Sequence, residues 1–278
     1  MIQAENIRYE YIRRDDHDEV VAVEAALDAV SFRVQKGDFI GIIGSNGSGK
    51  STLARHLNAL LVPEEGTLLV DGIDTSEEGV IFKVRTKVGM IFQNPDNQIV
   101  SSTIEEDIAF GPENIGIPQP ELKRRVDDAL ELVGMSNEAK GSPERLSGGQ
   151  KSRIAIAGVL AMKPKCMVFD EATAMLDPAG RDDILKAVRE LNDQGITIIW
   201  ITHHSEEVVN ADRILVMDKG KLVLEGTPRV VFSEVDRLRE YGLDVPAVTA
   251  LAYELGMPPG IMTAEEIIDL EQRGNRWN

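Results

Sequence analysis

A glycine-rich turn that ends in a lysine and two hydroxyl residues is the first segment of the sequence that could do chemistry. Residues 44–52 match G-x-x-x-x-G-K-[ST] at every fixed position, between an apolar strand-like segment and a helical one. The glycines let successive backbone N–H groups point at phosphate oxygens, and the helix start adds positive dipole. A chance glycine-rich turn is the alternative, but strand, turn, lysine and helix are all in register. The predicted phosphate site comprises Gly44, Ser45, Asn46, Gly47, Ser48, Gly49, Lys50, Ser51 and Thr52.

Two adjacent carboxylates follow an apolar segment at residues 166–169, which is expected to be a strand. Asp170 at the strand end suits a Mg²⁺ contact through water, and the Ser51 hydroxyl suits a direct one. Glu171 suits a general base that polarises an attacking water molecule. An acidic loop after a strand is common. This pair, however, accompanies a phosphate turn, which favours hydrolysis of a bound nucleotide.

A second turn of small residues opens a helix expected over residues 151–160. A serine and two glycines at a helix N-terminus form an anion site by the same dipole argument. A single domain hardly needs two phosphate sites of this kind, whereas two chains facing head to tail would use both. Taken alone, the turn is an ordinary capped helix start. Its residues are Leu146, Ser147, Gly148, Gly149 and Gln150.

The elements that must position these residues alternate between strands and helices. Residues 1–43 have the period of two typical of strands, and the charged run 13–19 is expected to be a solvated hairpin loop. Later strands are expected at 166–169 and 196–201, with a helix face between them. Alternating strands and helices predict a mainly parallel sheet covered by helices.

Two further units interrupt or follow this alternation. Residues from about 95 to 163 are mostly helical and predict an inserted subdomain. After a hairpin that ends near residue 225, residues 226–278 predict two or three short helices, the last with a capping box of Thr263 and Glu266. Their apolar faces must be buried against their own domain or against the same region of a partner.

The composition narrows the classes of protein. Among 278 residues the net charge is −17, which disfavours non-specific binding to nucleic acid or anionic lipid. The single cysteine, Cys166, excludes an internal disulfide. No stretch approaches the ~20 apolar residues of a membrane-spanning helix, and the first residues do not resemble a secretory signal.

The order of these motifs, together with Gln93, Leu176-Asp177 and His203, resembles the ATPase of ABC transporters over residues 1 to about 225. The resemblance implies an α/β P-loop NTPase (RecA-like) core with an antiparallel β-subdomain, an inserted helical subdomain and a C-terminal helical extension. It implies ATP and Mg²⁺ as ligands and an ATP-driven dimer. The Ser147–Gln150 turn of one subunit would close over the γ-phosphate of the other.

The same resemblance implies a role for each remaining residue. Gln93 would join Mg²⁺ and the attacking water to a membrane partner, and Asp177 would bridge to the opposite subunit's phosphate turn. His203 would contact the γ-phosphate, although His204 adjoins it. Tyr11 would stack on adenine, with Tyr9 as the alternative aromatic.

Three segments, residues 92–98, 109–114 and 172–178, resemble the energy-coupling-factor ATPases. That resemblance implies uptake of vitamins or metal ions on the cytoplasmic face of a membrane. The implied partners are a second, related ATPase, a transmembrane coupling subunit and exchangeable membrane substrate-binding subunits. The sequence departs from this family at residues 151–153 and at 203–207. Which substrate is carried, and whether the second ATPase is a copy or a relative, stay open.

Two other functions compete with this interpretation. An ATPase of another importer, or one that acts on nucleic acid or ribosomes without a transporter, would share the motifs. The latter class usually carries two ATPase units or a long coiled coil, and this chain has one unit, no heptads and a negative charge. A scaffold that only binds nucleotide is disfavoured by Glu171 and His203, so we expect an enzyme without a nucleic-acid partner.

Overall fold

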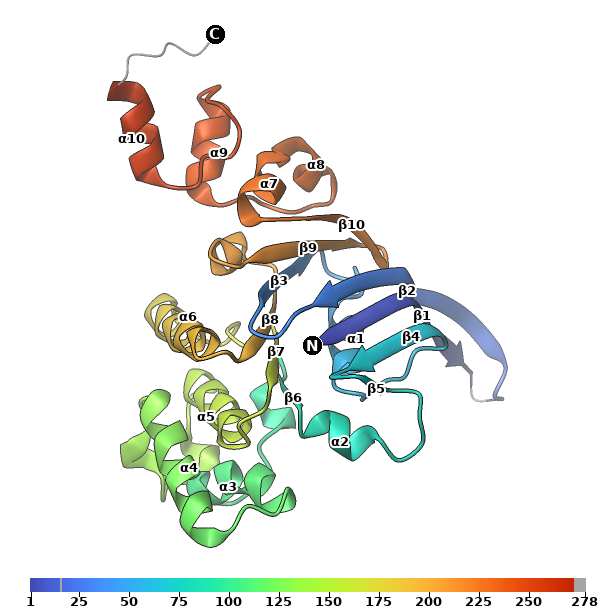
Figure 1. Ribbon diagram of the computed structural model, residues 1–278, viewed down its shortest axis with the longest axis vertical. Helices are drawn as coiled ribbons and strands as arrows, with labels where there is room; N and C mark the ends of the chain where they lie inside the picture. Colours follow the sequence, from blue (N-terminus) through green and yellow to red (C-terminus); the bar gives the residue numbers. More distant parts are fainter. Residues whose placement is uncertain (16, 273–278) are drawn as a thin grey trace.

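A central six-stranded sheet carries the chain's functional loops in the computed structural model, which describes residues 1–15 and 17–272 (Figure 1). The strand order is β10-β9-β3-β8-β7-β6, parallel except for β10, which pairs antiparallel with β9. This confirms the mainly parallel sheet predicted from the alternation. The strands are β3 (Phe39–Gly44), β6 (Val88–Ile91), β7 (Cys166–Asp170), β8 (Thr197–Thr202), β9 (Arg213–Asp218) and β10 (Lys221–Gly226).

A second, antiparallel sheet of four strands lies beside the first, in the order β2-β1-β4-β5. The hairpin loop predicted from the charged run is too long at its start, because Arg13 and Arg14 still pair with β2 as the end of β1; Asp16 of that run lies outside the described residues. The helix that follows the glycine turn, α1 (Lys50–Leu57), contacts strands of both sheets, and one apolar cluster is shared by all three layers. A short helix, α2 (Ile81–Arg85), follows this sheet. The strands are β1 (Ile2–Arg14), β2 (Val20–Val34), β4 (Glu65–Val70) and β5 (Ile73–Asp74).

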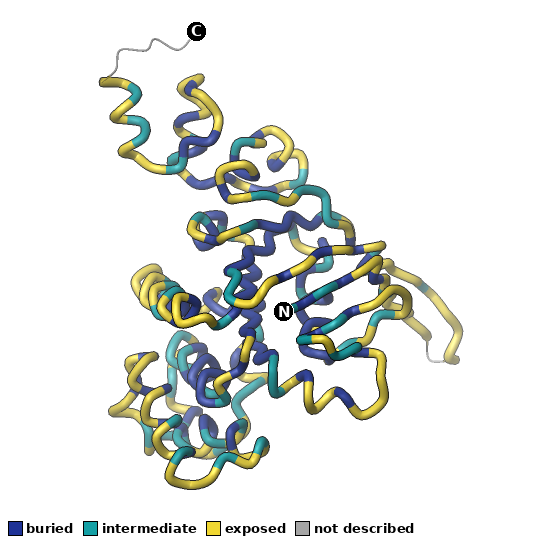
Figure 2. The backbone as a smooth tube through the Cα atoms, in the orientation of Figure 1, coloured by how far each residue is buried: buried dark blue, intermediate teal, exposed yellow. Residues whose placement is uncertain are grey.

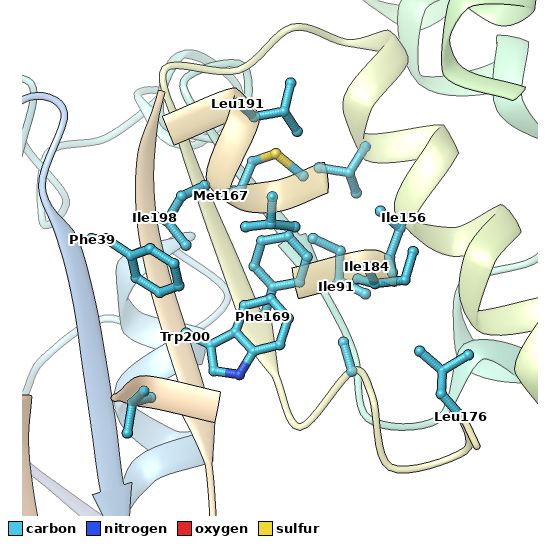
Figure 3. Packing of buried hydrophobic residues seen from close by; sticks show 14 of the residues in the cluster. Phe39, Ile91, Ile156, Met167, Phe169, Leu176, Ile184, Leu191, Ile198 and Trp200 are labelled. Carbon is cyan, nitrogen blue, oxygen red and sulfur yellow. The ribbon is translucent and has the colours of Figure 1, made fainter. Parts of the chain in front are cut away.

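The helical subdomain predicted at 95–163 consists of α3 (Ile104–Asn114), α4 (Gln119–Leu132) and α5 (Gly148–Ala161). A 3₁₀ turn at Pro95–Asn97 precedes them. The helix α6 (Pro178–Asp193) covers the same face of the central sheet. Figure 3 shows the packing of this side, where Phe169 and Trp200 stack with ring centroids 4.6 Å apart.

Up to residue 272 the C-terminal region forms four helices rather than two or three. Proline and glycine segments separate α8 from α9 and α9 from α10, whereas a single non-helical residue, Glu234, separates α7 from α8. They are α7 (Pro228–Ser233), α8 (Val235–Glu240), α9 (Ala247–Glu254) and α10 (Ala264–Gln272). The predicted capping box is present before α10, where Glu266 N–H donates to Thr263 Oγ1 and Thr263 N–H donates to Glu266.

The two halves of this region are buried to different degrees (Figure 2). The buried apolar residues of α7 and α8 belong to the main core. Helices α9 and α10 share a small separate cluster with Ala252, Met257 and Ile261 at its centre, and Ala250 alone of α9 packs against the main core. Helix α10 buries none of its residues fully. In the part of the chain that the structure describes, no helix has the length and apolar character to cross a bilayer.

Candidate functional site

A cavity of about 570 Å³ opens where the glycine turn meets the hairpin of the antiparallel sheet. It lies at the carboxyl end of β3 and the start of α1, where ligands bind in open parallel sheets. Residues far apart in the sequence line it together. They are Tyr11, Glu24, Ala26, Asn46, Gly47, Ser48, Gly49, Lys50, Ser51, Thr52, Gln93 and Glu171.

At the end of the glycine turn, Gly49 has a backbone conformation and surroundings that only glycine permits. Gly49 has a φ of 100°, and a Cβ there would lie 2.4 Å from the carbonyl oxygen of Ala26. This close approach fixes the start of α1 against β2. The turn can therefore direct its N–H groups into the cavity, as the sequence predicts.

Lys50 places a cation at the base of the cavity. Its ammonium donates to the carbonyl oxygens of Gly44, at 2.8 Å, and Ser45, at 3.0 Å, and the residue is only 4% exposed. Burial lowers the pKa of Lys50, and the nearby carboxylates of Glu171 and Asp170 oppose that shift. A buried cation beside a polar cavity is suited to phosphate oxygens.

Asp170 ends β7 directly opposite the glycine turn. The Ser51 hydroxyl donates to its Oδ1 at 2.9 Å. Burial raises the pKa of Asp170, and the hydrogen bond from Ser51 acts against that rise. The structure thus brings together the two oxygen ligands that the sequence assigned to a cation.

Two side chains converge on the carboxylate of Glu171. Gln93 Nε2 donates to Glu171 Oε2 at 2.9 Å, and His203 Nδ1 lies 3.5 Å from the same oxygen. The Glu171 backbone has a φ of 50°, which is uncommon for a residue with a side chain, and its N–H donates to the carbonyl of Ile201 at 3.0 Å. The carboxylate is thereby aimed at the cavity by its own strained backbone and by two neighbours.

The two tyrosines occupy different environments. Tyr11 lines the cavity, and its hydroxyl oxygen lies 3.4 Å from Arg55 Nη1 and 3.5 Å from Thr52 Oγ1. Tyr9 packs edge-on against His56, with ring centroids 4.8 Å apart, and contacts the core. The geometry therefore favours Tyr11 as the aromatic surface for a base.

The Ser147–Gln150 turn lies elsewhere and contributes nothing to the cavity lining. Ser147 caps α5 by accepting from Gln150 N–H at 3.3 Å, and Gln150 Oε1 accepts from Ser147 N–H at 2.9 Å. Asp177 likewise caps α6, with Oδ1 accepting from Gly180 N–H at 2.9 Å. Within a single chain these residues therefore lie apart from the phosphate turn, as the predicted head-to-tail arrangement of two chains requires.

Glu24 and Ala26 of β2 are lining residues that the sequence interpretation missed. Tyr11 pairs with Glu24 across the hairpin. The charged run at 13–19 indicated this hairpin, so counting outward from its turn could have placed Glu24 beside Tyr11. The register shifts between β1 and β2 make that count unreliable from sequence alone.

The donor set suits Mg²⁺ better than a transition metal. Ser51 and Asp170 offer oxygen ligands, and Gln93 adds an amide oxygen nearby. Among the described residues, no three His, Cys, Asp or Glu side chains gather as a metal site. A cation here would depend on nucleotide phosphates for its remaining ligands, as Mg²⁺ does in nucleotide enzymes.

Comparisons with known proteins agree with this geometry. Residues 27–174 match the ABC transporter family. The energy-coupling factor transporter ATP-binding protein EcfA1 of Clostridium novyi is 52% identical over 276 residues, covering 99% of this chain and 96% of that protein. The cobalt import ATP-binding protein CbiO of Syntrophus aciditrophicus is 45% identical over 271 residues, covering 98% and 94%.

Two solved structures share the fold. CbiO1 of Clostridium perfringens, part of the ABC transporter complex CbiONQ, has a TM-score of 0.72 at 38% identity, covering 86% of this chain and 93% of that one. The bacterial ABC transporter cassette MJ0796, solved as a dimer, has a TM-score of 0.74 at 28% identity, covering 82% and 99%. From the matched family and the identity with these relatives over nearly the whole chain, this chain belongs to the ABC transporter family and, within it, to the ATP-binding ATPase subunits of energy-coupling-factor transporters.

Proposed function

We propose that this chain hydrolyses ATP with Mg²⁺ at the described cavity and couples hydrolysis to uptake of vitamins or metal ions through membrane partners. The observation that carries the catalytic part is the convergence of Gln93 and His203 on Glu171, beside the buried Lys50. Phosphoryl transfer to water depends mainly on positioning and charge stabilisation, and this arrangement supplies both.

Each residue has a distinct part in the proposed mechanism. Lys50 and the backbone N–H groups of the glycine turn hold the phosphates. Ser51 and Asp170 would hold Mg²⁺, which neutralises phosphate charge when bound. Glu171 accepts a proton from the attacking water, while Gln93 and His203 keep its carboxylate directed at that water, next to the γ-phosphate.

A groove of about 440 Å³ between the sheet core and the helical subdomain is the proposed docking site for the transmembrane coupling subunit. Phe82, Val100 and Phe110 line it and are 59%, 64% and 51% exposed, an unusual density of apolar surface. Phe92, which also lines the groove, directly precedes Gln93, so pressure there is transmitted to the catalytic residues. Such docking would keep the chain peripheral to the membrane, on its cytoplasmic face.

The proposed ATPase partner is a second copy or a related chain, arranged head to tail. This accounts for the position of the Ser147–Gln150 turn outside the cavity of its own chain. Exchangeable membrane subunits would supply the transported molecule. Leu251 on α9, Leu255 directly after it and Ile268 on α10 are exposed, and we propose that this surface holds the two ATPases together when the nucleotide sites are open.

Replacement of Glu171 by glutamine tests the catalytic assignment. Glu171→Gln preserves the shape and the contacts of the side chain but removes the base, so turnover should fall by roughly 10²–10⁴-fold with ATP binding intact. The exposed neighbour of the His203 segment, Glu206, provides a matched control as Glu206→Gln. If Glu171→Gln instead weakened ATP binding and left turnover per bound ATP unchanged, Glu171 would not be the base.

A further inference from the structure

Glu207 is a buried carboxylate that the mechanism above does not use. Its side chain is 2% exposed and is contacted by polar groups from three separate segments of the chain, two by hydrogen bonds and one by an ion pair. Thr173 Oγ1 donates to Oε1 at 2.9 Å, and Trp200 Nε1 donates to Oε2 at 3.0 Å. Arg181 Nε lies 3.3 Å from Oε1 as an ion pair without hydrogen-bond alignment. A buried charge is costly unless it is matched in this way, so these contacts fix where Glu207 lies.

The two segments joined by this carboxylate are the two that carry catalytic side chains. Glu207 belongs to the 3₁₀ turn Ser205–Val208, which closely follows His203. Thr173 lies between Glu171 and Asp177. The two segments follow β7 and β8, which are adjacent and parallel. Figure 3 shows the rings of Phe169 and Trp200, which are paired across these strands, stacked on one face of the sheet.

The loop around Thr173 is held by hydrogen bonds of its own backbone. Ala174 N–H donates to the carbonyl of Glu171 at 3.1 Å, and Leu176 N–H donates to the carbonyl of Thr173 at 3.0 Å. Two consecutive turns therefore connect Glu171 with Asp177, and the Thr173 side chain lies between them, 2% exposed. The Thr173 hydroxyl reaches out of these turns to Glu207.

We propose that Glu207 and Thr173 are positioning residues that lock the His203 segment to the Glu171–Asp177 loop, so that the two move as one unit. His203 approaches Glu171, which lines the chain's own cavity, whereas Asp177 lies outside that lining, beside the surface proposed to meet the second ATPase. The lock therefore communicates between the nucleotide bound by this chain and the partner's site. The inference rests on the proposed roles of His203, Glu171 and Asp177.

Paired substitutions of Thr173 separate a hydroxyl-dependent lock from simple packing. Thr173→Val keeps the volume and removes the hydroxyl, whereas Thr173→Ser keeps the hydroxyl and removes a methyl group. In the assembled transporter, the valine variant should lower kcat by about 10- to 100-fold with little change in KM for ATP, because misplacement of catalytic groups affects the chemical step. The serine variant should retain nearly full kcat. If only packing mattered, the valine variant would keep its kcat and the serine variant would lose it, and the proposal would be wrong.

A matched control comes from Thr197 at the opposite end of β8. It is fully buried, and its hydroxyl accepts from the backbone N–H of Gly37 at 3.0 Å. Thr197→Val should lower the melting temperature as Thr173→Val does, but leave kcat unchanged at temperatures where both chains are folded. Equal kcat losses in the two valine variants would overturn the lock, because stability would then explain both.

Glu207→Gln, compared with Glu206→Gln, repeats the test without touching Thr173 and serves if Thr173→Val does not fold. Loss of the charge should lower kcat at unchanged KM only at position 207, and equal kcat in the two variants would refute the lock.

Glu171→Gln distinguishes failure of the lock from failure of the proposed catalytic site. If it abolishes turnover while Thr173→Val behaves like wild type, the lock is wrong and the catalytic site stands. If Glu171→Gln has no effect, the proposed site itself is wrong.

Discussion

Truncation at two positions should separate the two halves of the C-terminal region. A chain ending at residue 225 lacks Val231, Phe232, Val235 and Leu238, all of which are buried in the main core. Complete burial of each such side chain stabilises a fold by roughly 1.5–3 kcal/mol, so the four together contribute about 6–12 kcal/mol. Domains are stable by only about 5–15 kcal/mol in total, and this truncated chain should not fold.

A chain ending at residue 245 keeps those four residues. It lacks α9 and α10, whose small apolar cluster is removed with them. Against the rest of the chain this region packs the partly buried Ala250 and Met262, and ion pairs join Arg229 to Glu266 and Arg239 to Glu254. Their side chains are largely exposed, and pairs of this kind contribute little to stability. This chain should therefore fold and bind ATP.

Thermal unfolding and ATP binding check the folding part, and sedimentation of the purified complex without nucleotide checks pairing. We expect the 1–245 chain to bind ATP normally but to separate from its partner when nucleotide is absent. If it remained paired, the dimer-holding role of α9 and α10 would be wrong. If the 1–225 chain folded cooperatively with a normal melting temperature, the burial argument for α7 and α8 would fail.

Three further substitutions test the site and the scaffold. Lys50→Ala should abolish ATP binding or turnover, because the buried ammonium is the cation at the base of the cavity; wild-type hydrolysis in the assembled complex would contradict the assignment. Gly148→Asp should leave ATP binding by the isolated chain intact but prevent ATP-driven closure, measured by crosslinking between subunits. A Cβ there would lie 3.7 Å from Met175, an ordinary contact, so the variant should fold, and normal closure would refute the head-to-tail arrangement. Asp71→Asn should lower the melting temperature by about 2–4 °C at pH 7. Hydrogen bonds from Lys165 and Lys87 hold the pKa of Asp71 below its ordinary value of 3.8, so the difference from wild type should be full above that value and disappear as the pH falls well below it. A difference independent of pH would exclude these ion pairs as its cause.

The sequence predicted the elements whose signals are local. The phosphate turn at 44–52 and the strand ending in Asp170 were identifiable because glycine spacing and apolar runs are contained within a few residues. The contact between Gln93 and Glu171 joins residues 78 apart and required the family resemblance to suggest its role. Its geometry depends on the parallel pairing of β6 with β7, which no local pattern specifies.

Glu207 shows the limit of local interpretation most clearly. It follows Ser205 and Glu206, and such a polar run is ordinarily solvated. The 3₁₀ turn directs neighbouring side chains to opposite environments, so Glu206 is exposed while Glu207 is buried. Only the tertiary positions of Thr173 and Trp200 make that burial tolerable, and neither is adjacent to Glu207 in the sequence.

The burial of Cys166 gives the protein an intrinsic chemical reporter. It is the only cysteine and lies in β7, between β6 and β8, where burial raises the pKa of its thiol to about 12. At pH 8 only about one molecule in 10⁴ would carry the reactive thiolate, and reagents reach it only when the central sheet opens. Cysteines introduced on the surface can thus be labelled without first removing Cys166. The slow modification of Cys166 itself would time the opening of the folded chain.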